Sequence, residues 1–143
     1  MKGEWFIIKK LNRKGFTLIE LLAVIVVLAI ILVVTIPSVI SSMNKAREEQ
    51  FKNAVATVED YMKKQIDACS LGDESLVKYD TSIFTTNTCN IDTTKASTIV
   101  ENSGYTYGEA ASDFSSIVVT TAGKVTKATA GTDSKFNGEI YNG

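Results

Sequence analysis

The chain has 143 residues, a formal net charge of −1 and no histidine. Its length allows one small domain beside a membrane segment. Histidine is the commonest general base and the commonest zinc ligand, and no zinc-ligand spacing, phosphate-binding glycine loop or nucleophile motif stands in its place. An enzyme is therefore not expected, and neither a cofactor nor a metal site is predicted.

The charge is distributed unevenly along the chain. Five of the 15 basic residues lie within residues 1–15, which hold one acid, so the remainder carries 10 basic and 15 acidic residues. An acidic body argues against binding to a phosphate backbone, and no clear nucleic-acid site is predicted. A local basic patch of Lys124, Lys127 and Lys135 stays open as an alternative.

Residues 16–36 form an apolar run that only Thr17, Glu20 and Thr35 interrupt. As a helix this run would be about 31 Å long, close to the roughly 30 Å of a membrane's hydrocarbon core. Four basic residues stand directly before it: Lys9, Lys10, Arg13 and Lys14. The excess of positive charge on this side predicts an N-terminus in the cytoplasm and a body outside.

Three interpretations of the run compete. A cleaved secretory signal is disfavoured by the length of the run and by the poor cleavage site at Val39-Ile40-Ser41. A plain single-span anchor explains the length but gives Glu20 no purpose, although an acid near the cytoplasmic end is tolerable. In the third interpretation a leader is removed before the run, which then becomes the new N-terminus.

The residues Gly15-Phe16-Thr17-Leu18-Ile19-Glu20-Leu21-Leu22 support the third interpretation, because they resemble the class III signal of type IV pilins and pseudopilins. The resemblance implies that a prepilin peptidase and N-methyltransferase cuts after Gly15 and methylates Phe16. It also implies that Glu20 is the assembly acid. Pro37 matches the family's proline near the end of the apolar segment.

Glu20 also has a physical argument of its own. Cleavage would give Phe16 a free amino group, and the two groups, at i and i+4, could pair within one helix or between neighbouring copies. An unpaired charge at low dielectric is heavily penalised, so the pairing would select the register of assembly rather than add much affinity.

Beyond the apolar run the pattern becomes amphipathic. Pro37 is expected to kink the helix. Apolar residues then recur mostly at steps of three or four, with Arg47 the polar exception, at Ile40, Met43, Arg47, Phe51, Ala54, Val55, Val58, Tyr61, Met62, Ile66 and Cys69. This spacing predicts a helix with one buried face that ends between Cys69 and Gly72.

Residues 70–96 are expected to form a loop rich in Ser, Thr, Asn and Asp. Its acids Asp73, Glu74, Asp80 and Asp92 lack the alternating spacing of a calcium-binding loop, so solvated loop acids are the default. Cys69 and Cys89 are the only cysteines, and a disulfide between them is favoured because the head is expected to face outward. Two free thiols are the alternative. Many pilins carry a disulfide nearer the C-terminus, and this pair departs from that pattern.

From residue 97 onward the pattern favours β-structure. Strands are predicted over 97–101, 105–107, 115–121, 124–128 and 136–141, with Ala122-Gly123 as a hairpin turn. An antiparallel sheet of this size needs a cover, which the amphipathic helix can supply. The expected fold is α+β and pilin-like, with the hydrophobic half of the helix protruding from the head.

The expected organisation is a cleaved leader over 1–15, a transmembrane and assembly helix over 16–37, and a globular head over 38–143. Within the head the helix reaches about residue 70, a loop covers 70–96 and the sheet covers 97–141.

The expected function is a structural subunit of a type IV pilus or pilus-like filament. The chain would lie in the inner membrane with its N-terminus inside and then at the cell surface. Its partners would be copies of itself, the peptidase, an inner-membrane assembly platform and an ATPase motor. The alternative is a minor pilin, or a competence or type II secretion pseudopilin, that acts in DNA uptake, secretion or binding. No calcium-loop signature of the major secretion pseudopilin is present near the C-terminus.

Overall fold

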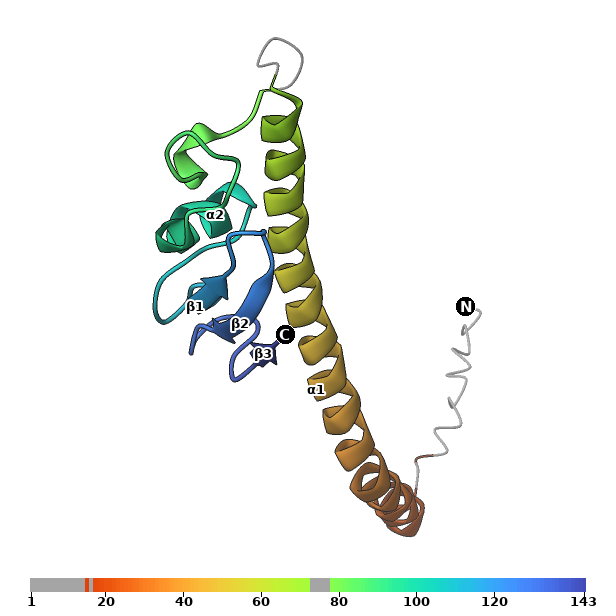
Figure 1. Cartoon of the computed structure of the whole chain (residues 1–143). Helices are drawn as coiled ribbons and strands as arrows, with labels where there is room; N and C mark the ends of the chain where they lie inside the picture. Colours follow the sequence, from red (N-terminus) through yellow and green to blue (C-terminus); the bar gives the residue numbers. More distant parts are fainter. Residues whose placement is uncertain (1–14, 16, 73–77) are drawn as a thin grey trace, which may run out of the picture. The chain divides into compact units, whose positions relative to one another are not determined.

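The computed structural model describes Gly15, residues 17–72 and residues 78–143 (Figure 1). The elements are α1 (Leu18–Leu71), two 3-10 turns η1 (Thr81–Ile83) and η2 (Thr93–Lys95), α2 (Ala96–Asn102), and strands β1 (Phe114–Val119), β2 (Val125–Ala130) and β3 (Ile140–Asn142). A long N-terminal helix and a small three-stranded antiparallel sheet make an α+β, pilin-like arrangement, as the sequence predicts. The chain divides into two units between Ile40 and Ser41, and α1 contributes to both.

In the first unit α1 is apolar on every side. All residues of α1 from 18 to 46 are exposed. This range includes every residue of α1 in the first unit, which ends at Ile40. Among the described residues, α1 is the one helix whose length and composition would allow it to cross a membrane. A helix that is apolar all round is stable only where lipid or other protein surrounds it.

In the second unit one face of α1 is buried. The buried residues of the helix, at steps of three and four with one longer gap, are Phe51, Ala54, Val55, Val58, Met62 and Ala68. Ile40 and Met43, which the spacing assigned to the same stripe, are 53% and 57% exposed. The stripe is therefore shorter than predicted, because Phe51 is the first side chain of α1 to enter the core.

The sheet has the order β1-β2-β3, and both pairings are antiparallel. The β1–β2 hairpin turns at Gly123, which has a φ of +76°. A Cβ atom at this position would lie 2.8 Å from Cδ1 of Ile66, so the turn lies directly against α1. The sequence predicts this hairpin, although each strand is offset by one or two residues from its predicted bounds.

The core lies between the second half of α1 and the sheet, on the side where Figure 1 shows α2 and the strands. The ring of Phe51 lies 5.4 Å from the rings of both Phe114 and Phe136, measured between centroids. Ile99 and Val100 of α2 are fully buried in the same cluster. The helix therefore covers the sheet, as an antiparallel sheet with one apolar face requires.

The predicted strand over 97–101 is wrong, because these residues belong to α2. Ile99 and Val100 are adjacent and both are fully buried. Adjacent side chains point to opposite faces of a strand, but on a helix they lie about 100° apart and can share one apolar face. Packing against the core has overridden the β-propensity of Ile and Val.

Two shorter predictions also need correction. Residues 105–107 form no strand, and Tyr107 makes a single parallel bridge with Phe114. The final strand is β3, Ile140–Asn142, rather than 136–141, because Phe136 is buried in the core and the chain from 131 to 138 turns.

The two loop acids that the structure describes have local partners. Asp80 caps η1 by accepting a bond from the backbone N–H of Ser82, and Asp92 caps η2 by accepting one from Thr94. Hydrogen bonds with Ser82 lower the pKa of Asp80, and the side-chain bond from Thr94 lowers that of Asp92. Asp73 and Glu74 lie outside the described residues. Within the described part of the chain, no three acidic or cysteine side chains group as metal ligands.

Candidate functional site

The predicted cleavage position lies at the start of α1. Gly15 is exposed, and a Cβ atom added there would meet no other atom within 4 Å. Phe16 and residues 1–14 lie outside the described residues. Gly15 therefore packs against none of the described residues, which is compatible with a requirement for glycine set by what binds there.

Thr17 and Glu20 form a reciprocal cap on the first turn of α1. The backbone N–H of Thr17 donates to Oε2 of Glu20 at 2.9 Å, and the backbone N–H of Glu20 donates to Oγ1 of Thr17 at 3.3 Å. This is the capping box that Thr or Ser produces with Glu three residues later. It satisfies two N–H groups that would otherwise have no partner at the helix end.

The capping box is a local role of Glu20 that sequence reasoning misses when it considers only assembly. The signal is present in the sequence as Thr17 followed three residues later by Glu20. Oε2 accepts the bond from Thr17, while Oε1 has no partner among the described residues. Glu20 can therefore keep its cap and still receive one further donor through Oε1.

The rest of the apolar helix has few polar groups. Thr35 directs its Oγ1 to the backbone oxygen of Ile31 at 3.0 Å, so its hydroxyl is satisfied inside the helix. Pro37 lies inside α1 and has no N–H to donate to the carbonyl of Val33. The surface of this segment is thus apolar apart from its first turn, which suits lipid or neighbouring helices.

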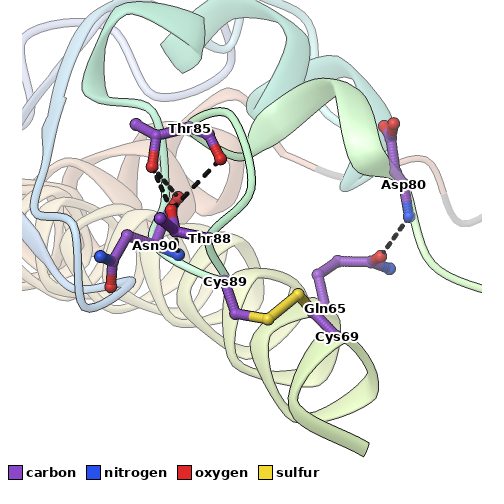
Figure 2. Close-up of a disulfide and its surroundings, with 7 residues drawn as sticks. All are labelled: Gln65, Cys69, Asp80, Thr85, Thr88, Cys89 and Asn90. Carbon is purple, nitrogen blue, oxygen red and sulfur yellow. Dashed lines mark hydrogen bonds between the residues drawn. A yellow bond between two sulfur atoms is a disulfide. The ribbon is translucent and has the colours of Figure 1, made fainter. Parts of the chain in front are cut away.

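Cys69 and Cys89 are bonded in the structure (Figure 2), with their Cα atoms 5.7 Å apart. This separation lies within the usual range for a disulfide. The bond links the last turns of α1 to the chain segment that follows η1. Nearby, Oε1 of Gln65 accepts the backbone N–H of Asp80 at 2.8 Å, so α1 is attached to the chain both before and after η1.

Residues 85–90 form a compact turn beside the disulfide. The hydroxyls of Thr85 and Thr88 bond to each other, and Oγ1 of Thr88 also donates to the backbone oxygen of Thr85 at 3.2 Å. The backbone N–H of Asn90 donates to Oγ1 of Thr88 at 3.3 Å. The backbone N–H of Thr85 also donates to the oxygen of Asn90 at 3.0 Å, so side-chain and backbone bonds together close the turn.

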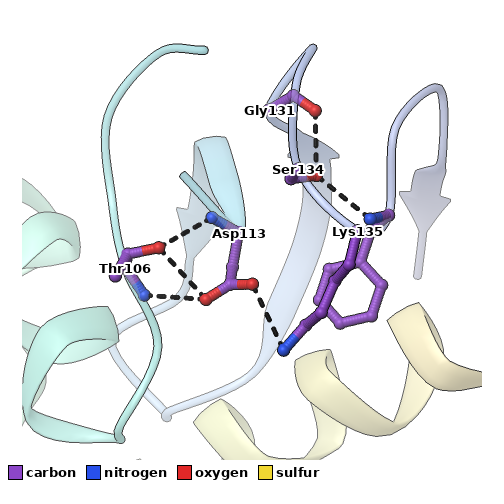
Figure 3. A network of polar contacts seen from close by, with 6 residues as sticks. Thr106, Asp113, Gly131, Ser134 and Lys135 are labelled. Atoms are coloured by element: carbon purple, nitrogen blue, oxygen red, sulfur yellow. Dashed lines mark hydrogen bonds and ion pairs between the residues drawn. The ribbon is translucent and has the colours of Figure 1, made fainter. Parts of the chain in front are cut away.

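A second polar network involves Lys135 of the predicted basic patch (Figure 3). Its Nζ lies 3.4 Å from Oδ1 of Asp113 and 4.8 Å from the ring centroid of Phe136. Asp113 in turn accepts the backbone N–H of Thr106 at 3.1 Å. Lys135 therefore has both a carboxylate and an aromatic ring as neighbours within the head.

Glu59 is a structural residue that the sequence does not reveal. It lies on the half-buried side of α1, and its Oε1 accepts the backbone N–H of Val125 at 2.7 Å. The carboxylate thereby attaches the helix to the first residue of β2. No sequence signal distinguishes Glu59 from the other charged residues of α1, because its partner is a backbone group 66 positions away.

Comparison with known proteins adds one match. Residues 10–36 match the family model described as the prokaryotic N-terminal methylation motif. The matched segment begins among the basic residues, includes Gly15, Thr17 and Glu20, and ends with the apolar run. No curated protein and no solved structure matches the chain.

Proposed function

We propose that this chain, which carries the class III signal of type IV pilins and pseudopilins, is the precursor of a structural subunit of a type IV pilus or pilus-like filament. The match over residues 10–36 is the observation that carries the proposal. It implies processing by a prepilin peptidase and assembly into a filament. The exposed apolar surface of α1 supports it, because such a surface needs lipid before assembly and neighbouring helices afterwards.

Processing is proposed to occur between Gly15 and Phe16. The peptidase would cut on the cytoplasmic face and methylate the new amino group of Phe16. The exposure of Gly15 and the open space around it are compatible with entry into a protease site. The basic residues before Gly15 would keep the leader inside the cell while the head lies outside.

Assembly is proposed to use the charge of Glu20. In the unassembled chain its carboxylate is held by Thr17, and Oε1 is available to a neighbour. The amino group of Phe16 from an adjacent copy would be that donor once the leader is removed. Because an unpaired charge is costly among apolar side chains, only registers that bring the two groups together would be stable.

The remaining steps follow from the proposed location. The precursor would wait in the inner membrane as a single-pass protein, and an assembly platform with an ATPase motor would lift it into the filament. Pro37 would allow the apolar segment to bend during this transfer. The finished filament would lie outside the cell and would serve adhesion, motility or a related function.

N-terminal sequencing and intact mass of the protein in sheared cell-surface material test this proposal. The expected product begins at Phe16, with or without one methyl group. A full-length chain found only in the membrane would overturn it and would favour a single-span anchored domain. A Gly15→Leu variant is the matched control, because a Cβ atom added at Gly15 meets no described atom within 4 Å, so the substitution should block cleavage and leave the described fold unchanged.

A second role, that of a minor subunit with a binding surface, is favoured by a pocket of about 610 Å³ in the head. Pockets of this size are typical of sites for small ligands. The abundance of the chain in sheared surface material separates the two roles. A main building block dominates that material, whereas a minor subunit is scarce relative to the other pilins.

A further inference from the structure

The pocket lies beside the Cys69–Cys89 bond, where the turn of residues 85–90 approaches the end of α1 (Figure 2). Its lining consists of four threonines, one asparagine, two aromatic residues and the disulfide. These residues are Cys69, Tyr79, Thr81, Phe84, Thr85, Thr86, Asn87, Thr88 and Cys89. All of them belong to the second unit of the chain.

The chemistry of this lining restricts the ligand. None of the nine described lining residues is basic, so this part of the pocket offers no counter-charge to a phosphate, a sulfate or a carboxylate. None of these described residues is acidic, so they offer no carboxylate ligand to a cation. Hydroxyl and amide groups each donate and accept hydrogen bonds, and so they suit a neutral ligand that also does both.

Some polar side chains of the lining form hydrogen bonds within the turn, and others can form them with a ligand. Thr85 and Thr88 use their hydroxyls to hold the turn together. By contrast, Thr81, Thr86 and Asn87 are exposed and Tyr79 is half-buried, so their polar groups are accessible to a ligand. The committed threonines and the disulfide therefore fix the turn, and fixed groups lose less entropy when a ligand binds.

The aromatic residues add an apolar surface next to these groups. The rings of Tyr79 and Phe84 meet edge to face, with centroids 6.1 Å apart. Both residues are half-buried and therefore still present part of their rings to solvent. A ligand that fits must combine many neutral hydroxyls with an apolar face of C–H groups, and a sugar ring has both.

We propose that this pocket binds a neutral oligosaccharide. Thr81, Thr86 and Asn87 would bond its hydroxyls, and the Tyr79–Phe84 pair would pack against the C–H face of a sugar ring. The proposal does not rest on filament formation, because every residue involved lies in the head of a single chain. It would give the head a receptor-binding activity that a purely structural subunit does not need.

The test uses the full-length chain in a detergent without a sugar headgroup, applied to an array of immobilised neutral, sialylated and sulfated oligosaccharides. The expected result is binding to at least one neutral oligosaccharide. Thr86→Val and Asn87→Gly should each weaken that binding about fivefold, the effect of losing one hydrogen bond. Glycine is chosen at 87 because Asn87 has a φ of +61°, which glycine adopts without strain.

Thr132→Val is the matched control, because Thr132 is an exposed threonine outside the pocket. Its binding should equal that of the unchanged chain. An unchanged unfolding midpoint and an intact disulfide show that each variant is folded. Binding only to charged oligosaccharides, no binding to any neutral one, or equal losses in Thr132→Val would overturn the proposal. So would retention on a peptide array run in parallel with none on the oligosaccharides.

Discussion

Glu20 illustrates how one side chain can combine a local and an intermolecular role. Its carboxylate closes the capping box with Thr17, and its charge is proposed to pair with the Phe16 amino group of a neighbour. Alanine at position 20 would remove both roles at once. Glutamine separates them, because it also serves as the third residue of a capping box but has no charge.

We expect both Glu20→Ala and Glu20→Gln to insert into the membrane and to fail in filament assembly. Thr17→Val removes the cap and keeps the charge, so it should lower helix stability by about 1 kcal/mol and still assemble. Electron microscopy and quantification of sheared filaments measure the outcome, and membrane fractionation is the control for insertion. Normal filaments from Glu20→Gln would show that the charge does not set the register.

Gly123 is the glycine whose position is most restricted by both backbone and packing. Its φ of +76° disfavours any side chain, and an added Cβ would meet Ile66 and Met62 of α1. We expect Gly123→Ala to lower the free energy of unfolding by roughly 2–4 kcal/mol, from backbone strain and overpacking together.

Gly138→Ala is the matched control for this substitution. Gly138 has a φ of +85°, but nothing lies within 4 Å of its Cβ position, so only the backbone strain of about 1–2 kcal/mol applies. Chemical denaturation of the full-length chain in detergent gives both values. An equal decrease in the free energy of unfolding in the two variants would mean that the close contact of Gly123 with α1 adds nothing to the cost of the substitution.

Asp80 and Asp92 make the stability of the segment before α2 depend on pH. Both carboxylates accept hydrogen bonds at a cap, which lowers the pKa of each. In acid the unfolded chain then binds more protons than the folded chain. The two carboxylates therefore contribute fully to the free energy of unfolding above their pKa values in the unfolded chain. This contribution is lost as the pH falls through their lower pKa values in the folded chain. Unfolding midpoints at neutral and acidic pH should differ less in an Asp80→Asn, Asp92→Asn variant than in the unchanged chain. An identical acid sensitivity would contradict the role of the caps.

At the scale of elements, α1 is one helix in two environments. Up to residue 46 all of its side chains are exposed, whereas from Phe51 onward one face is buried under the sheet. The sequence marks the change, because an unbroken apolar run gives way to spacings of three and four. Attachment of α1 to the head also depends on polar groups: Glu59 accepts a hydrogen bond from Val125 of the sheet, and Gln65 accepts one from Asp80 before η1.

The Cys69–Cys89 bond joins α1 to the part of the head with the least regular structure. In the chain-entropy account, closing a segment of 20 residues contributes about 3 kcal/mol. We expect Cys69→Ser to lower the free energy of unfolding by about that amount and to weaken any ligand binding at residues 85–90. A two-hydrogen mass deficit in the purified chain would establish the bond in solution. Cys89→Ser should lower the free energy of unfolding by the same amount as Cys69→Ser. A difference between the two values would point to an effect other than the lost bond.

At the scale of the whole molecule, the two ends of the chain are expected on opposite sides of the membrane. In spheroplasts that lack the prepilin peptidase, added protease should digest the head and leave an N-terminal epitope tag intact. This orientation is predicted from the basic residues before Gly15, because positive flanks stay inside. Lysed spheroplasts are the control and should lose both parts. A protected head in intact spheroplasts would reverse the proposed orientation.

The amino-acid sequence by itself determined the features whose signals are local. The motif around Gly15 and Glu20, the apolar run, the amphipathic pattern from Phe51 onward and the β1–β2 hairpin all depend on residues that are neighbours in the chain, whereas the point where burial begins did not follow from the pattern. The capping box was also present as a local pattern, and the α+β class followed from the order of these elements. The role of Glu20 in assembly stays a prediction, because the proposed partner would belong to another copy.

Only the tertiary structure decided the features that depend on distant partners. Residues 97–101 form a helix because Ile99 and Val100 face one core together, although their β-propensity favours a strand. Glu59 caps the start of β2, and Lys135 is paired with Asp113 across the head. The pocket lined by Cys69 and residues between 79 and 89 lies where the disulfide joins the turn to α1. Such contacts join groups far apart in the chain, and short-range spacing carries no information about them.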